Sequence, residues 1–234
     1  MKTFKHGGGP GDAIYGLATM KHLGGGILHL NFDGVRQFDQ RLFIKQSYIK
    51  EIKHHIIRPN EKWMSFPVDY NLDLFRSQPF YDYTLLECHA MGLGVKFDYT
   101  KPWLSNIEPK RIAPIVISDT GKLRWPGITV NWNELKGFED HCVFTGFEHE
   151  HKTFVKNRGL NVKFYKIKDA YEWAQLILGS KLYIGNQSSG LSIAEGLKVP
   201  RVADIWEGGS KQYPIGENGY YELSKEVIRR YLNE

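Results

Sequence analysis

The chain has 234 residues, a hydrophobic fraction of 41%, a net charge of +5 and a sequence pI near 9.0. This length allows one large domain or two small ones with a well-packed core. The sequence contains no run of about 18 apolar residues, which excludes an obvious membrane span. The positive charge favours anionic partners such as phosphates or nucleic acid, although the basic residues are spread along the chain.

The N-terminal residues and the two cysteines indicate the cellular compartment of the protein. Residues 1–6 lead into glycines rather than into an apolar region, so we expect no secretory signal. Cys88 and Cys142 are far apart and have no C-x-x-C spacing, so we expect two buried thiols in a reducing compartment. The sequence therefore predicts a cytoplasmic protein.

The first thirty residues predict a strand, a helix and a second strand. Phe4 begins the first strand, the glycine loop 7–11 follows, and Asp12 stands where a helix N-cap belongs. Ile27–Leu30 forms the second strand. Residues 35–60 are predicted to be helical and basic, with His54 on the helix surface.

The second half of the chain predicts an α/β unit. Short apolar strands alternate with helices from residue 112 onward, which is typical of a parallel sheet covered on both faces. Residues 61–108 are rich in aromatic residues and turn formers, and we predict no order of elements there. We expect an N-terminal Rossmann-like domain over 1–109, a second over 110–216 and a C-terminal helix within 217–234.

Three loops follow predicted strands, at residues 7–12, 118–122 and 185–190. Ligands of doubly wound sheets bind at the carboxyl ends of the strands. A cleft between two facing sheets would bring all three loops together.

The loop 185–190 is suited to a phosphate. Ser188 and Ser189 supply hydroxyl donors, and the helix that follows turns its amides and its positive dipole end toward the loop. The simpler interpretation is a helix cap with a serine as N-cap residue. Further along that helix, Glu195 could accept hydrogen bonds from sugar hydroxyls or could simply face solvent.

The other two loops suggest a base and a cation. The glycine loop 7–11 matches neither a Walker A motif nor G-x-G-x-x-G. Asp12 would repel a phosphate but could take a proton from a hydroxyl nucleophile, or it could be an N-cap carboxylate. Lys122, beside Ser118 and Thr120, could hold a diphosphate or could be a surface lysine.

A metal site is not expected. His141, Cys142, His149 and His151 lie close in sequence, but no second cysteine pair completes a zinc site.

Four segments resemble the ADP-heptose lipopolysaccharide heptosyltransferases, which have the two-Rossmann GT-B fold. The segment Gly11–Tyr15 resembles the family's Gly-Asp-apolar helix start, and Cys142–Glu148 resembles its strand ending in Thr-Gly-x-x-Glu. The segments 118–135 and 185–200 resemble its donor-phosphate segment and its Asn-Asp-Ser-Gly-Pro-x-His-x-Ala loop with a Val-Pro turn. The resemblance is best over residues 7–30 and 110–205.

This resemblance implies roles for particular residues. Asp12 maps onto the base that acts on the acceptor hydroxyl, with Gly9 and Gly11 in the acceptor-side loop, and Lys122 maps onto the family's donor-phosphate lysine. The implied donor-binding residues are Ser118, Thr120, Lys122, Gly146, Asn186, Gln187, Ser188, Ser189, Gly190 and Glu195.

The loop also departs from the family pattern. The family's aspartate is Gln187 here and its histidine is Ser192, so the donor need not be ADP-heptose. The chain is also similar to small bacteriophage proteins with Gly-Asn-Gln-Ser loops, which raises the modified bases of phage DNA as acceptors.

Together these patterns predict a metal-independent glycosyltransferase that moves a sugar from a nucleoside-diphosphate sugar to an acceptor hydroxyl. The acceptor is a glycan or modified DNA, and no cofactor is expected beyond the nucleotide sugar. The alternative is a non-catalytic protein that binds a nucleotide or a sugar phosphate.

Overall fold

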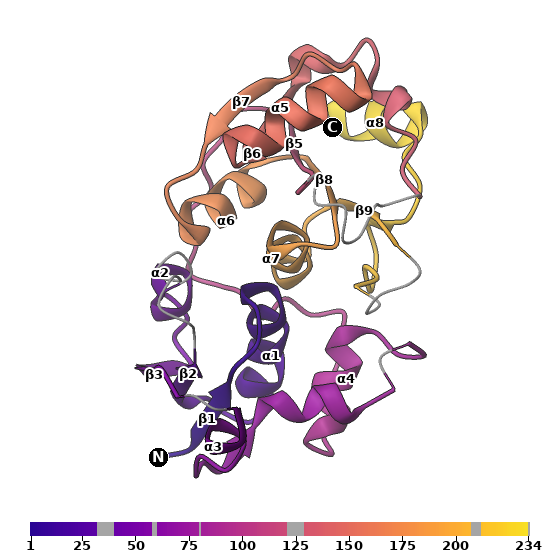
Figure 1. Cartoon of the computed structure of the whole chain (residues 1–234). Coiled ribbons are helices and arrows are strands. Elements are labelled where there is room, and N and C mark those ends of the chain that lie inside the picture. The colour runs from indigo at the N-terminus through magenta and orange to yellow at the C-terminus, as the bar shows by residue number, and fades with distance from the viewer. Residues whose placement is uncertain (32–39, 58–59, 80, 121–128, 207–211, 234) are drawn as a thin grey trace.

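The computed structural model describes residues 1–31, 40–57, 60–79, 81–120, 129–206 and 212–233. These residues form two lobes, each built around its own parallel sheet, which lie one above the other in Figure 1. We call residues 1–92 the N lobe and residues 115–233 the C lobe. The prediction of an α/β fold with two Rossmann-like halves is confirmed.

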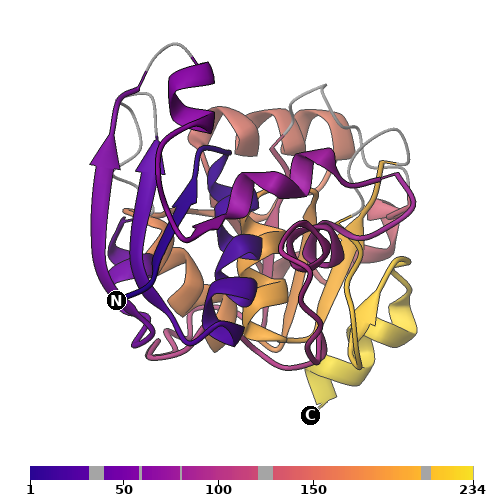
Figure 2. The ribbon, with the colours of Figure 1, turned by 90° about the horizontal axis from the view of Figure 1, so that it is seen from below.

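The N lobe contains a four-stranded parallel sheet in the order β3-β2-β1-β4, and the strands lie side by side in Figure 2. Helix α1 begins after the N-cap Gly9 with a proline in its first turn, where the missing amide costs nothing. The elements are β1 (Thr3–His6), α1 (Pro10–His22), β2 (Gly26–Asn31), α2 (Gln40–Ile44), β3 (Ile49–His55), α3 (Asn60–Met64), β4 (Tyr70–Asn71), the 3₁₀ helix η1 (Leu72–Ser77) and α4 (Leu85–Gly92).

The prediction of helix over residues 35–60 is wrong for most of its described part. Within the described residues 40–57 only α2 is helical, and β3 adds a parallel strand at the sheet edge, with His54 on that strand. Ile49 is buried, whereas Lys50, Glu51 and Lys53 are exposed or nearly so. An edge strand tolerates such charges because only one side of it is hydrogen-bonded.

The C lobe contains a six-stranded parallel sheet in the order β10-β9-β8-β5-β6-β7. Counted from β5, this is the strand order 3-2-1-4-5-6 of doubly wound nucleotide-binding folds, read from the β7 edge. Its elements are β5 (Ile115–Ser118), η2 (Trp132–Leu135), η3 (Glu139–His141), β6 (Cys142–Gly146), α5 (Glu148–Arg158), β7 (Lys163–Lys166), α6 (Ala170–Gly179), β8 (Leu182–Asn186), α7 (Ser189–Leu197), β9 (Arg201–Asp204), β10 (Gly219–Tyr220) and α8 (Lys225–Asn233).

The two lobes share one hydrophobic core, because α1 of the N lobe packs against α7 of the C lobe. The connecting segment crosses between these helices at Trp103, whose ring nitrogen donates to the Ile14 carbonyl at 2.8 Å. The backbone amide of Trp103 donates to the Gly196 carbonyl at 3.0 Å. A side chain at Gly196 would press on Leu104, so this glycine lets the connecting segment lie against α7.

The end of the chain belongs to the C lobe. Strand β10 lies beyond residue 216 and pairs with β9, so the six-stranded sheet extends into the segment predicted as a separate C-terminal helix. Helix α8 buries Ile228 and Tyr231 in the core of that lobe. None of the described helices is long and apolar enough to cross a membrane.

Both cysteines are buried free thiols, as predicted. Burial raises the pKa of the Cys88 thiol to about 11 and that of Cys142 to about 12. Both side chains are therefore protonated, unreactive core residues at neutral pH.

Candidate functional site

Each sheet has a point where the chain order reverses, between β1 and β4 in the N lobe and between β5 and β8 in the C lobe. Loops diverge there to opposite faces of a sheet, which opens a crevice at the carboxyl ends of the strands. The predicted loops follow β1, β5 and β8, so all three are at these two switch points.

Side chains join the two sides of the C-lobe switch point. The Asn186 amide nitrogen donates to the Thr120 hydroxyl at 2.9 Å, and the Thr120 amide donates to the Asn186 side-chain oxygen at 3.4 Å. Ser118, at the end of β5, hydrogen-bonds the hydroxyl of Tyr183 in β8. The structure therefore brings three of the predicted donor-site residues together.

Tyr183 is a residue of this site that the sequence did not reveal. Its ring is completely buried, and burial raises the pKa of its hydroxyl. A β-carbon at Gly185 or Gly190 would lie 2.2 or 2.4 Å from that hydroxyl oxygen, so the two glycines make room for it. The two glycines that follow Tyr183, Gly185 in β8 and Gly190 in α7, are the only signal of this role in the sequence.

The start of α7 presents unused backbone donors. Ser188 is the N-cap in an extended conformation, but its side chain makes no capping hydrogen bond, and the first hydrogen bond of the helix runs from the Ser192 amide to the Ser188 carbonyl. Within the described part of the chain, the amides of Ser189 and Gly190 have no hydrogen-bond acceptor. These amides, with the positive end of the helix dipole, form a place where an anion can bind.

The glycine loop of the N lobe has its amides occupied. Gly7 donates to both carboxylate oxygens of Asp73 at 2.9 Å, and Gly8 donates to the His6 ring at 3.0 Å. Asp73 is buried and also accepts from Trp63 and Arg76, each at 2.8 Å. This loop therefore holds its own shape and does not cradle a phosphate.

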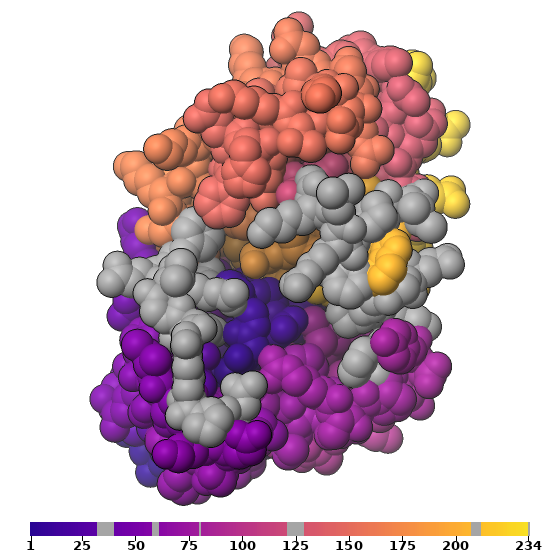
Figure 3. Space-filling model, viewed as in Figure 1, coloured from indigo at the N-terminus to yellow at the C-terminus, as the bar shows by residue number. Residues whose placement is uncertain are grey.

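Asp12 lies where the two switch points meet. It occupies the third position of α1 rather than the N-cap, and it is partly exposed, with one oxygen 3.3 Å from the Gly9 amide. A β-carbon on the preceding Gly11 would lie 3.7 Å from the Ser189 amide nitrogen. The candidate base is thus one residue away from the open start of α7. In Figure 3 the indigo start of the chain meets the orange atoms of the C lobe between the two lobes.

Glu195 is buried in an ion-pair cluster that the sequence did not reveal. Its side chain has no exposed surface, and its carboxylate forms ion pairs with Arg201 and Lys198. One of its oxygens also accepts from the Ile215 amide at 3.2 Å. This geometry favours a structural role, because both oxygens are already held by partners inside the protein. The predicted contact with a ribose or sugar stays a prediction.

Two of the remaining predicted residues, Gln187 and Gly146, also lie at strand ends of the C-lobe sheet. The Gln187 side chain accepts from the Trp206 amide at 2.8 Å, which ties the loop after β8 to the end of β9. Gly146 ends β6 with a φ of 144°, which favours glycine. Lys122 lies outside the described residues. No group of three metal-ligating side chains occurs in the described ranges, and His151 instead hydrogen-bonds the Val162 carbonyl at 2.8 Å.

Of the comparisons with known proteins, only the one with solved structures found similar chains. No protein-family model matches the chain, and no curated protein does. Among solved structures, a family 9 glycosyltransferase from Veillonella parvula aligns with a TM-score of 0.62 and 12% identity, over 97% of this chain and 90% of that one.

Two Escherichia coli structures are also similar. Heptosyltransferase WaaC with ADP-2-deoxy-2-fluoro heptose gives a TM-score of 0.55 and 11% identity, over 99% of this chain and 98% of that one. The iron-containing dodecameric glycosyltransferase TibC gives a TM-score of 0.56 and 13% identity, over 99% of this chain and 74% of that one. The chain therefore has the GT-B fold of the glycosyltransferases. The heptosyltransferase-like fold predicted from the motifs is confirmed.

Proposed function

We propose that the protein is a glycosyltransferase that uses a nucleoside-diphosphate sugar. The observation that supports this most strongly is the contact between the two lobes at the start of α1 and α7, where Gly11, the residue before the partly exposed Asp12, lies beside the unused amide of Ser189. Transfer from a nucleotide sugar needs both groups, a base for the acceptor and a site for the leaving diphosphate. The GT-B fold of the similar structures supports the same conclusion.

In the proposed reaction, Asp12 takes the proton of an acceptor hydroxyl as that oxygen bonds to the anomeric carbon of the donor. The bond from this carbon to the diphosphate breaks, and its electron pair leaves with the nucleoside diphosphate. The amides of Ser189 and Gly190, the Ser188 hydroxyl and the dipole of α7 stabilise the developing charge. Lys122 is proposed as an additional cation that stabilises the diphosphate.

We propose further that transfer needs no metal and no cofactor, because amides and cations of the chain neutralise the diphosphate. Activity should then be unchanged after dialysis against a chelator. Loss of activity that an added divalent metal restores would overturn this part of the proposal.

The acceptor is proposed to be a glycan or a modified base of phage DNA. The exposed basic residues on β3, Lys50 and Lys53, favour an acidic acceptor of either type. The salt dependence of acceptor binding separates the two, because a duplex releases counterions from many phosphates and its affinity falls steeply with salt.

The direct test is a panel of nucleotide sugars incubated with glycan and DNA acceptors, with release of nucleoside diphosphate as the readout. We expect acceptor-dependent release for one donor class. The rival function is a non-catalytic nucleotide or sugar-phosphate binding protein, which the changed residues Gln187 and Ser192 favour. It would show ligand-dependent stabilisation without release.

A further inference from the structure

A cation from helix α5 reaches the C-lobe switch point. Arg158 is the last residue of α5, and its guanidinium lies 3.7 Å from the carboxylate of Asp119, the residue directly after β5. Asp119 also accepts from the side-chain amide of Asn186, at the end of β8, at 3.4 Å. We propose that Arg158 is a positioning residue of the diphosphate site, which neutralises Asp119 and keeps that carboxylate bonded to Asn186 so that it does not repel the diphosphate. This inference rests on the proposed function and goes beyond it by adding a residue that acts through another side chain.

The Asp119 carboxylate lies where an unbalanced negative charge would oppose diphosphate binding. Its side chain is only 13% exposed, and Thr120, a predicted donor-binding residue, follows it directly. A second carboxylate, Asp204 at the end of β9, is close enough to interact, because burial and the Asp119 charge raise the pKa of Asp204 and Arg158 opposes that rise. Charges interact more strongly in such partly buried surroundings than in water, so these carboxylates need a cation beside them.

The guanidinium of Arg158 is held in place although 35% of its side chain is exposed. It lies over the ring of Trp132, 5.7 Å from the ring centroid, which is a favourable position for a cation. The Trp132 ring is itself fixed, because its nitrogen donates to the Asp204 carboxylate at 3.2 Å and its face meets the edge of Phe154 at a centroid distance of 5.0 Å. Arg158 is therefore oriented before any ligand binds.

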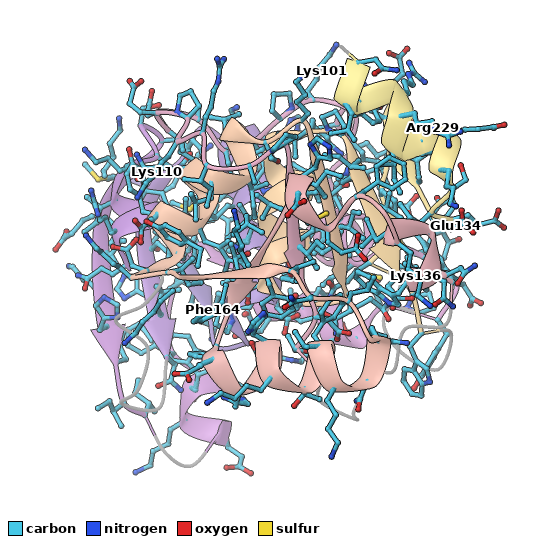
Figure 4. The ribbon with its side chains drawn as sticks, turned by 90° about the horizontal axis from the view of Figure 1, so that it is seen from above. Lys101, Lys110, Glu134, Lys136, Phe164 and Arg229 are labelled. Carbon is cyan, nitrogen blue, oxygen red and sulfur yellow. The ribbon has the colours of Figure 1, made fainter. Side chains whose placement is uncertain are left out.

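The backbone that carries Arg158 is also determined by packing. Gly159 follows in the left-handed conformation, with a φ of 64°, and ends the helix there. The next residue, Leu160, is completely buried. Figure 4 shows α5 running from the side of Phe164, on β7, towards the side of Glu134, in η2. The end of α5 thus lies on the side of the sheet where η2 packs, which agrees with the contact between the guanidinium and the η2 tryptophan.

The hydrogen bonds of this network leave one donor for a ligand. The Asn186 amide nitrogen donates to Asp119 at 3.4 Å and to the Thr120 hydroxyl oxygen at 2.9 Å. Because that oxygen accepts a hydrogen bond, the hydroxyl hydrogen of Thr120 can be donated elsewhere. A charged acceptor strengthens the hold on Asn186. The affinity for a diphosphate should therefore depend on Arg158 only while Asp119 is charged.

The test is a double-mutant cycle measured by titration calorimetry on the whole chain, with ADP, UDP and pyrophosphate as probes. Arg158→Gln should weaken binding at least about fivefold, whereas Arg158→Lys, which keeps the charge, should weaken it no more than about twofold. In the Asp119→Asn background, Arg158→Gln should change the affinity less than about twofold, because no charge is left to neutralise.

The matched control is Arg41→Gln. Arg41 of α2 makes the same kinds of contact on other elements, an ion pair with Asp169 at 3.3 Å and a guanidinium 4.5 Å from the Tyr171 ring centroid. Its replacement should leave the affinity for all three probes unchanged. Thermal melting of every variant verifies that the protein measured is folded.

The outcomes separate this inference from the proposed function. Suppose that at least one probe binds the unaltered chain. If Arg158→Gln then weakens binding no more than Arg41→Gln does, or equally with and without Asp119→Asn, or no more than Arg158→Lys does, the positioning role is wrong and the proposed function stands. If none of the three probes binds the unaltered chain, the proposed function itself is wrong.

Discussion

The two switch points of the molecule both carry loops of small residues but differ in whether the backbone amides of the loop are occupied. In the N lobe, the amides of Gly7, Gly8 and Gly9 all donate to side chains of the same lobe. In the C lobe, the amides of Ser189 and Gly190 find no acceptor in the described part of the chain. A small-residue loop after a strand can thus either hold a carboxylate or bind an anion. The difference depends on which side chains reach its amides.

The largest expected effect concerns the carboxylate at the meeting point of the two lobes. Asp12→Asn should reduce sugar transfer by about 10²- to 10⁴-fold, because the amide cannot accept the proton of the acceptor. Nucleotide binding should change little, since the proposed diphosphate site is in the other lobe. Steady-state kinetics and calorimetry on the same preparation check both parts, and a variant that transfers at the normal rate would remove Asp12 from the mechanism.

The second-largest expected effect is a loss of stability when the glycine loop 7–11 loses its buried carboxylate partner. Asp73→Asn removes the charge that accepts from Gly7, Trp63 and Arg76. Hydrogen bonds to a charged group contribute about 1.5–3 kcal/mol each, so the free energy of unfolding should fall by at least that amount. Denaturant titration measures it. The affinity for nucleoside diphosphate should stay within about twofold in protein that is still folded, and an equal loss of affinity would show that the two switch points are not separable.

A smaller effect is expected at Tyr183, whose hydroxyl lies beside the loop 185–190 of the C lobe. Tyr183→Phe removes the hydroxyl that holds Ser118, and a hydrogen bond is worth about 0.5–1.5 kcal/mol. The dissociation constant for nucleoside diphosphate should therefore rise by at most about twofold to about 13-fold.

The matched control for that variant is Tyr48→Phe. Tyr48 is also buried and donates to the Trp103 carbonyl at 3.0 Å, away from both switch points. The Tyr48→Phe substitution should lower stability by a similar amount without changing nucleotide affinity. Equal losses of affinity in both variants would mean that Tyr183 acts only through general stability.

The last expected effect is a pH dependence of stability that arises in the N lobe. Burial lowers the pKa values of His6 and His89 in the folded protein. Below about pH 6.5 the unfolded chain therefore binds more protons, and stability should fall as the pH decreases, by at most about 1.4 kcal/mol per pH unit for each histidine. Thermal melts from pH 7 to pH 5 measure this slope. His89→Leu should reduce it, and an unchanged slope would assign the effect to other groups.

Much of the fold was predictable from the sequence because local patterns agree with the tertiary structure. The strands at Ile115, Cys142 and Leu182 are short apolar runs bounded by polar or glycine residues, and all three are central strands of the sheet. Strand β3 was not predictable, because its charged residues resemble a solvated helix and only pairing with β2 makes it a strand. At the edge of a sheet, tertiary pairing overrides local pattern.

The site was predictable in its position but not in its connections. The sequence placed Asp12, Thr120 and Asn186 at strand ends, and the sheet order brings these ends into two switch points. It could not show that Glu195 is enclosed by Arg201 and Lys198, because the partners of a charged helix residue depend on tertiary packing. The same applies to Asp73, whose role depends on its position beside the glycine loop.

The most direct test of diphosphate binding at the C-lobe switch point removes a single backbone amide donor. Ser188 is extended and Ser189 is the first helical residue, so Ser189→Pro fits the backbone and deletes one amide, whereas Ser189→Ala keeps the amide and deletes only the hydroxyl. Nucleoside diphosphate affinity, measured by calorimetry on both variants, should fall about tenfold for Ser189→Pro and much less for Ser189→Ala. Equal affinities in both variants and the unaltered chain would contradict the proposal that the start of α7 binds the diphosphate.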